Sequence, residues 1–226
     1  RPGTCPPMAR SMTSPMPSSS RQGLPDAVAQ AHPSAGRGAA AGRVTLTEQI
    51  ILRRFGEGEE GRLQAHVDGL SPLSRRYRFL GGINGLALAE ARRLIGDGTG
   101  PVFALAAEIE AADGPVLVGE GIVAIADGGA TAEFALSVAD AWQGQGIGRA
   151  VLAGIRLRAF GRGVDVLHGE VLRGNDRMLA LAGRAGFRAR AHPGDPRLIR
   201  IERRLSGAPR LRARLAGLGE GATLAA

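Results

Sequence analysis

Three glycines stand at alternate positions of the segment DAWQGQGIGRAVL, residues 140–152, namely Gly144, Gly146 and Gly148. The apolar residues that follow recur at helical spacing, so we expect a helix to begin at about Gly146. The first backbone N–H groups of a helix have no partner inside it and carry partial positive charge. Glycine has no Cβ, so a ligand can approach its backbone closely. The segment is therefore a candidate anion site suited to phosphate, the alternative being a plain loop.

The spacing separates this turn from two common phosphate-binding turns. The dinucleotide turn has the pattern G-x-G-x-x-G after a parallel strand, whereas here the pattern is G-x-G-x-G after a strand that we expect in an antiparallel meander. The P-loop needs a lysine after its last glycine. This chain contains no lysine in 226 residues. Neither turn is indicated.

The strand that precedes the glycines carries a candidate catalytic residue. Its alternation places two groups on opposite faces: Phe134, Leu136 and Val138 on one, and Glu133, Ala135, Ser137 and Ala139 on the other. The small neighbours of Glu133 leave room for a ligand, and a partly buried glutamate can act as a general base. The alternative is a solvated glutamate at a sheet edge. Glu120 and Glu170, on the strands before and after, are weaker candidates.

The surrounding elements predict an α+β fold with a mixed, mostly antiparallel sheet. Strands separated by the turns DG and DGG indicate a meander over 101–140. Ser71 and Pro72 mark a helix start, and Asn175 marks another. The expected order is β-α-α-β-β-β-α-β-α-β-β, with one further helical stretch before the meander. In chain order the elements lie within 43–55, 58–70, 71–82, 85–96 (the further stretch), 101–111, 115–127, 130–140, 149–163, 164–172, 175–187, 187–193 and 197–205.

Composition indicates one folded domain between two tails. Residues 1–42 are rich in Pro, Ser, Gly and Ala and have no hydrophobic period, so we expect a disordered tail. The folded domain should span 43–205, and 206–226 should form a second tail. Hydrophobic residues make up 44% of the chain, enough for a core, which must be mostly aliphatic because aromatic residues make up only 4%.

The basic charge does not by itself indicate a nucleic-acid partner. The net charge is +8, and all 29 basic residues are arginines scattered along a chain that is only 4% aromatic, so the stacking platforms of a nucleic-acid site are not indicated. No apolar run reaches the roughly 18 residues of a membrane span. The only cysteine is Cys5, and the four histidines lack metal-ligand spacing. We therefore expect a cytoplasmic protein that binds no metal, nucleic acid or membrane.

Several motifs together resemble the GNAT superfamily of acyl-CoA N-acyltransferases. The pattern Gln143-x-x-Gly146-x-Gly148 is similar to the coenzyme A pyrophosphate turn of that family, and it lies between a strand and a long helix as it does there. NDRMLALAGRAGF, residues 175–187, resembles the second cofactor-side helix, and the element order matches. LSPLSRRYRF, residues 70–79, is similar to a stretch of the GNAT domain in bacterial protein-lysine acetyltransferases. The resemblance covers about 43–205.

The resemblance implies acetyl-CoA as co-substrate and assigns the residues that hold it. It places the pantetheine arm along the backbone of the strand before the turn, and the diphosphate on the turn. The Arg149 guanidinium would add a side-chain contact, the alternative being a solvated charge in the first helical turn. The resemblance implies that Glu133 is the base that takes the proton of the acceptor amine. Asn175 would face the pantetheine, the alternative being a simple helix cap. The implied cofactor-binding residues are Leu136, Ser137, Val138, Gln143, Gly144, Gln145, Gly146, Ile147, Gly148, Arg149 and Asn175.

One position departs from the family pattern, and the acceptor stays open. Many members carry a tyrosine where this chain has Ala182, to protonate the leaving thiolate; the only tyrosine here is Tyr77. The helix over 71–82 would line the acceptor side with Arg75, Arg76 and Arg78. The expected acceptor is a protein lysine. The alternatives are a small amine or antibiotic, or a coenzyme A-binding module without catalysis, and the chain is expected to be a monomer or a homodimer.

Overall fold

The computed structural model describes residues 50–111 and 114–205. The expected tails, the start of the first strand before Ile50 and the DG turn at 113–114 lie wholly or partly outside these ranges, so the domain boundaries at 43 and 205 stay predictions. None of the helices within the described ranges is long and apolar enough to cross a bilayer.

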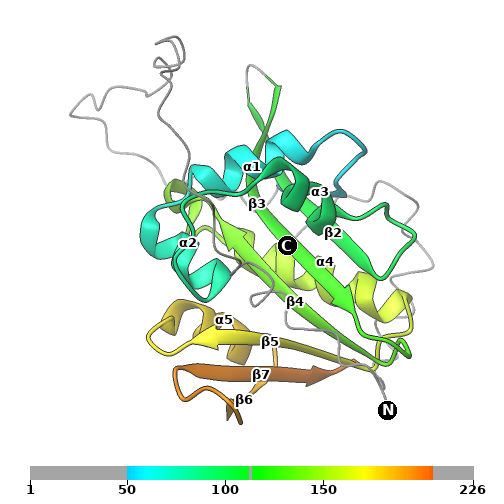
Figure 1. Ribbon diagram of the computed structural model, residues 1–226, viewed down its shortest axis with the longest axis vertical. Coiled ribbons are helices and arrows are strands. Elements are labelled where there is room, and N and C mark those ends of the chain that lie inside the picture. The colour runs from blue at the N-terminus through cyan, green and yellow to red at the C-terminus, as the bar shows by residue number, and fades with distance from the viewer. Residues whose placement is uncertain (1–49, 112–113, 206–226) are drawn as a thin grey trace, which may run out of the picture.

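The described residues form seven strands and five α-helices around one sheet (Figure 1). The strands are β1 Ile50–Arg54, β2 Val102–Ala111, β3 Gly114–Ile125, β4 Thr131–Val138, β5 Val166–Leu172, β6 Arg188–Ala191 and β7 Leu198–Arg204. The helices are α1 Glu60–Asp68, α2 Pro72–Phe79, α3 Leu88–Ile95, α4 Ile147–Gly161 and α5 Asp176–Arg184, with a short 3-10 turn at Asp140–Trp142. The predicted fold class is confirmed, and α3 is the further helical stretch.

The sheet has the strand order β1-β2-β3-β4-β5-β7-β6. All neighbours in it run antiparallel except β4 and β5, which are parallel because α4 carries the chain back to the start of β5. The parallel pairing lasts for three residue pairs only, from Thr131 with Val166 to Glu133 with His168. Beyond that point the two strands separate, as Figure 1 shows.

Helices cover the two faces of the sheet with separate apolar clusters. One cluster joins α4 and α5 to the side chains of Phe134, Leu136 and Val138, which confirms the predicted alternation of β4. The other joins α1, α2 and α3 to the opposite face, around Ile122. Figure 1 shows α4 behind the strands and α1 and α3 in front of them. Glu133, Ala135 and Ser137 thus lie on the face that α1 and α2 cover in part.

Candidate active site

The separation of β4 from β5 leaves one side of the last residues of β4 outside the ladder. Leu136 and Ser137 still pair with β3 but have no partner residue on β5. Free backbone groups on a separated strand can accept an extended ligand as an additional strand. Part of this edge is already used, because the Val138 carbonyl oxygen accepts a hydrogen bond from Gln143 Nε2 at 3.1 Å.

The glycine turn at the start of α4 presents an open helix terminus. Gly146 is the N-cap of α4 with φ 90°, and no side chain caps the helix there. Gly144 has φ 80°, and a Cβ placed at either glycine would meet nothing within 4 Å. The left-handed backbone explains why glycine occupies both positions. The open space beside uncapped N–H groups is what an approaching anion requires.

Two other residues of the turn face inward. The Ile147 side chain is buried in the core at 1% exposure, so only its backbone can meet a ligand. A Cβ at Gly148 would lie 3.3 Å from Leu181 Cδ2 of α5. The structure thus gives Gly148 a packing role between α4 and α5, which the spacing of the glycines did not reveal. Arg149 is exposed in the first turn of α4.

Gln143 connects three parts of the site that are distant in sequence. Its Nε2 donates to Ser74 Oγ of α2 at 3.2 Å as well as to Val138 O, and its Oε1 accepts from Arg177 Nη1 of α5 at 2.8 Å. The Gln143 side chain therefore fixes the shape of the turn from inside. Gln145 stays local, since its Nε2 donates to the Ala141 carbonyl oxygen.

Helix α2 is anchored across the end of β4. The Asp140 carboxylate accepts from Ser71 N at 2.9 Å, Ser71 Oγ at 2.8 Å and Ser74 Oγ at 2.7 Å. Burial by itself would raise the pKa of Asp140, but these hydrogen bonds outweigh it and lower the pKa. At the other end, Tyr77 Oη donates to the Gly174 carbonyl oxygen at 3.0 Å. Helix α2 therefore bridges the gap from the β4 side to the loop after β5.

A buried polar cluster lies beneath α2. Arg78 Nε and Nη2 donate to the two carboxylate oxygens of Glu120 at 2.6 and 3.2 Å, and Ser137 Oγ donates to Glu120 Oε1 at 2.7 Å. His66 Nε2 lies 3.0 Å from Ser137 Oγ. Burial lowers the pKa of His66 and so favours the neutral form of the ring. Sequence reasoning missed this use of His66 and of the Ser137 side chain.

Comparisons with known proteins agree with this geometry. A model of the acetyltransferase (GNAT) family matches residues 82–187. This chain contains a GNAT acetyltransferase domain. The GNAT domain of S. lividans PAT is similar at 26% identity with a TM-score of 0.61, over 68% of this chain and 89% of that one. A spermidine N-acetyltransferase from Vibrio cholerae, solved with CoA and spermine, shares the fold at 18% identity with a TM-score of 0.57, over 70% and 96% of the two chains. No curated protein matches.

The three carboxylates considered as a GNAT base lie in different surroundings. Glu120 is fully buried and already paired with Arg78, so it does not face an incoming amine. Glu170 is nearly buried and pairs with Arg200 at 2.7 Å. Glu133 is half-buried and forms the last pair with β5, at the point where β4 and β5 begin to separate. Of the three, Glu133 is the one placed at the opening, and its role as base stays a prediction.

The structure places the N-cap of α5, Asn175, and a residue within α5, Ala182, for which the GNAT pattern suggested roles in the site. Asn175 caps the helix, because its Oδ1 accepts from Met178 N at 3.1 Å. The expected helix cap is thus confirmed, and contact with pantetheine stays a prediction. Ala182, at the position where many GNAT enzymes carry a tyrosine, is 1% exposed and packs in the core.

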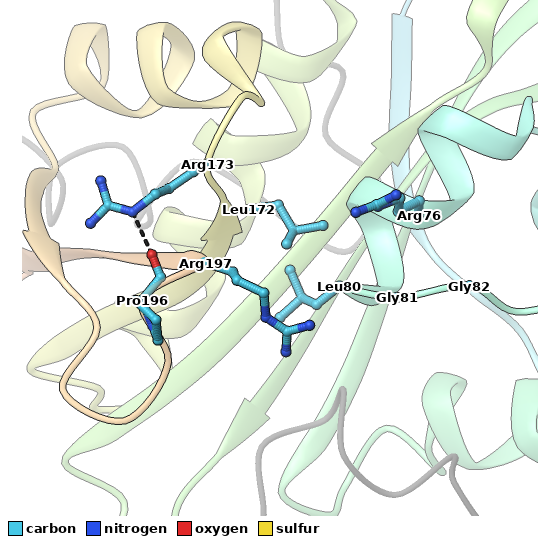
Figure 2. Close-up of a pocket in the computed structure, with 8 residues that line it drawn as sticks. All are labelled: Arg76, Leu80, Gly81, Gly82, Leu172, Arg173, Pro196 and Arg197. Carbon is cyan, nitrogen blue, oxygen red and sulfur yellow. Dashed lines mark hydrogen bonds between the residues drawn. The ribbon is translucent and has the colours of Figure 1, made fainter.

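A cleft of about 630 Å³ lies beside α2, the helix that the sequence predicts on the acceptor side, and we refer to it as the acceptor cleft. It opens between the end of α2, the end of β5 and the loop between β6 and β7, as Figure 2 shows. Leu80 and Leu172 supply its apolar surface. The full lining is Arg76, Leu80, Gly81, Gly82, Leu172, Arg173, Pro196 and Arg197.

Proposed function

We propose that this GNAT domain transfers an acetyl group from acetyl-CoA to an amine, and that the acceptor is a lysine side chain of a protein. The observation that carries the proposal is the separation of β4 from β5 directly beside the uncapped terminus of α4. A ligand lying along Leu136 and Ser137 would reach the open turn at Gly144 and Gly146. The strand edge and the helix terminus together fit a ligand that joins an amide-containing arm to a diphosphate.

Some residues of the turn would contact the diphosphate directly, and Gln143 would support the turn. The N–H groups of Ile147, Gly148 and Arg149 have no i−4 carbonyl partner within α4, whereas Ala150 N donates to Gly146 O. They would bind the diphosphate, with the guanidinium of exposed Arg149 as a second contact. Gln143 would act indirectly, by fixing the turn through Ser74 and Arg177.

Acetyl-CoA supplies an activated thioester, and the protein must supply a neutral amine beside it. A lysine amine is mostly protonated at neutral pH and must lose a proton before it can attack. In the transfer, the amine nitrogen bonds to the acetyl carbon, the C–S bond breaks and coenzyme A leaves. The Glu133 carboxylate takes the amine proton. Water protonates the departing thiolate, since Ala182 offers no hydroxyl.

A protein lysine is favoured over a small amine as the acceptor by one relative and one segment. The S. lividans PAT domain is similar at 26% identity over 89% of its length, whereas the spermidine N-acetyltransferases share the fold at lower identity. The segment over 70–79 forms α2 and its N-cap, which stand over the end of β4. A small amine is the alternative acceptor, because the fold itself is compatible with both.

The test is the activity of Glu133→Gln with acetyl-CoA and lysine peptides, followed by thiol release and mass spectrometry of the peptide. A positioned general base contributes about 10²- to 10⁴-fold, so kcat should fall by a factor in that range. The deficit should shrink as the pH rises, because more of the amine is then already neutral. Acetyl-CoA affinity should stay close to that of the unmodified chain.

Glu202→Gln is the matched control. Glu202 lies on β7, is half-buried and pairs with Arg190 at 3.1 Å, so the same change is made on the neighbouring part of the sheet. Its kcat should remain within about twofold of the unmodified chain, as expected for an ion pair at the protein surface. If Glu133→Gln keeps more than about a third of the activity at pH 7, Glu133 is not the base.

A further inference from the structure

The charged groups that line the acceptor cleft are all arginines. Arg76 comes from α2, Arg173 follows β5, and Arg197 precedes β7. No aspartate or glutamate is among the lining residues. Three segments that are far apart in sequence therefore contribute the same charge to one cleft.

Most of this charge is not neutralised by the protein. Among residues 50–111 and 114–205, no carboxylate lies within ion-pair distance of Arg76 or Arg173. Arg197 pairs with Asp195 at 2.7 Å, and its hydrogen bonds lower the pKa of Asp195 to about 2. Three arginines against one carboxylate leave the cleft with an excess of two positive charges at neutral pH.

The cleft is joined to the candidate active site by short connections. Leu172 ends β5 and lines the cleft, and Gly174, two residues later, accepts the hydrogen bond of Tyr77 Oη from α2. Arg76 is the neighbour of Tyr77 on the same helix. Arg173 is held at the rim, because its Nε donates to the Pro196 carbonyl oxygen at 2.6 Å, dashed in Figure 2.

We infer that this cleft selects acceptor lysines that stand in acidic segments of a protein. The inference rests on the proposed function, because it names the class of substrate for that site. The methylene stem of a lysine can pack on Leu80 and Leu172. Aspartate or glutamate residues flanking the lysine can pair with Arg76 and Arg173, since guanidinium and carboxylate match in charge and hydrogen-bonding geometry.

The same charge disfavours the acceptors of the polyamine enzymes that share this fold. A polyamine carries several ammonium groups, and each would meet unpaired guanidinium groups of like sign in the cleft. Like charges in close juxtaposition oppose binding and suppress the wrong partner. A lysine flanked by carboxylate side chains is instead attracted by the positive charge of the cleft.

The experiment measures how the unmodified chain acetylates matched peptides. Each peptide carries one lysine, flanked either by aspartate and glutamate or by asparagine and glutamine, and spermidine is a third acceptor. Pairs at an exposed site are worth a modest factor, so we expect a KM about three- to tenfold lower for the acidic peptide at low salt, with kcat similar for both. The difference should nearly vanish at about 0.5 M salt, where exposed charges are screened.

Arginine variants then assign the preference to the cleft. Arg76→Gln and Arg173→Gln should each raise the KM of the acidic peptide up to about fivefold, clearly more than they change the KM of the neutral peptide. Arg76→Glu should reverse the order of the two peptides. Arg204→Gln is the control for net charge, because Arg204 is exposed at the other end of β7 and does not line the cleft.

The outcomes separate this inference from the proposed function. Equal KM values for the acidic and neutral peptides, or equal losses with Arg204→Gln, would overturn the inference and leave peptide acetylation intact. Transfer to spermidine with no transfer to any peptide would overturn both.

Discussion

The buried pair of Arg78 and Glu120 gives a sharp test of how α2 is held on the sheet. Their side chains are 4% and 0% exposed, so water screens the charges little. In Arg78→Met, a side chain of similar length replaces the guanidinium, and the Glu120 carboxylate keeps only the Ser137 hydroxyl among its present donors. Glu120 would then be a buried charge without its counter-charge.

The expected loss is large for one substitution. Removing one partner of a buried ion pair destabilises a protein by about 3–5 kcal/mol. For a domain of this size each kcal/mol lowers Tm by about 2–4 °C, so Tm should fall by about 6–20 °C. The double variant Arg78→Met with Glu120→Gln carries neither charge of the pair and keeps an acceptor for Ser137. It should recover the free energy of unfolding to within about 1–2 kcal/mol.

Urea unfolding followed by circular dichroism measures each free energy of unfolding. Glu120→Gln alone should be destabilised like Arg78→Met, because it leaves the guanidinium buried without its counter-charge. A cycle of the four proteins then gives the coupling between the two side chains. A loss under about 1 kcal/mol for Arg78→Met, or a double variant no more stable than the single ones, would refute the argument that the pair is desolvated.

Two further predictions concern the histidine beneath α2 and the turn before α4. Burial lowers the pKa of His66, so near pH 6 the unfolded chain binds a proton that the folded chain does not, and stability should fall between about pH 7.5 and 5.5. His66→Gln should reduce this slope in urea unfolding, with the lowered pKa of His168 supplying the rest; an unchanged slope would contradict it. Gly146→Asp and Gly146→Asn share the left-handed strain but differ in charge. Calorimetry should show acetyl-CoA binding at least tenfold weaker for the aspartate variant than for the asparagine variant, a difference of about 1.4 kcal/mol or more. Equal affinities of the two variants would contradict the diphosphate assignment.

The local elements could be predicted because their causes lie within a few residues. Ser71 accepts a hydrogen bond from Ser74 N and Pro72 opens α2, as their types indicated. The alternation of β4 was visible for the same reason, since a strand exposes its faces with a period of two. The order of these elements indicated the α+β fold class, and the order known for the resembling family matched it.

The partners of these faces were decided only by tertiary structure. Periodicity shows which side chains turn inward, but not what they meet there, because that depends on how strands and helices distant in sequence are stacked. Glu120 could thus be considered as a base from sequence, whereas the fold encloses it with Arg78, 42 residues away. Gly148 belonged to a phosphate pattern, and packing against Leu181 gives it a second reason to be glycine.

The sequence by itself determined the glycine turn, the helix starts and the faces of β4, because neighbouring residues specify backbone conformation and amphipathic period. Tertiary structure decided how the site is assembled. Tyr77 meets Gly174, 97 residues later, and Gln143 meets Ser74, 69 residues earlier. The acceptor cleft joins arginines from three segments. Such contacts depend on the whole topology, since each chain segment brings only one wall of the cleft and the fold brings the walls together.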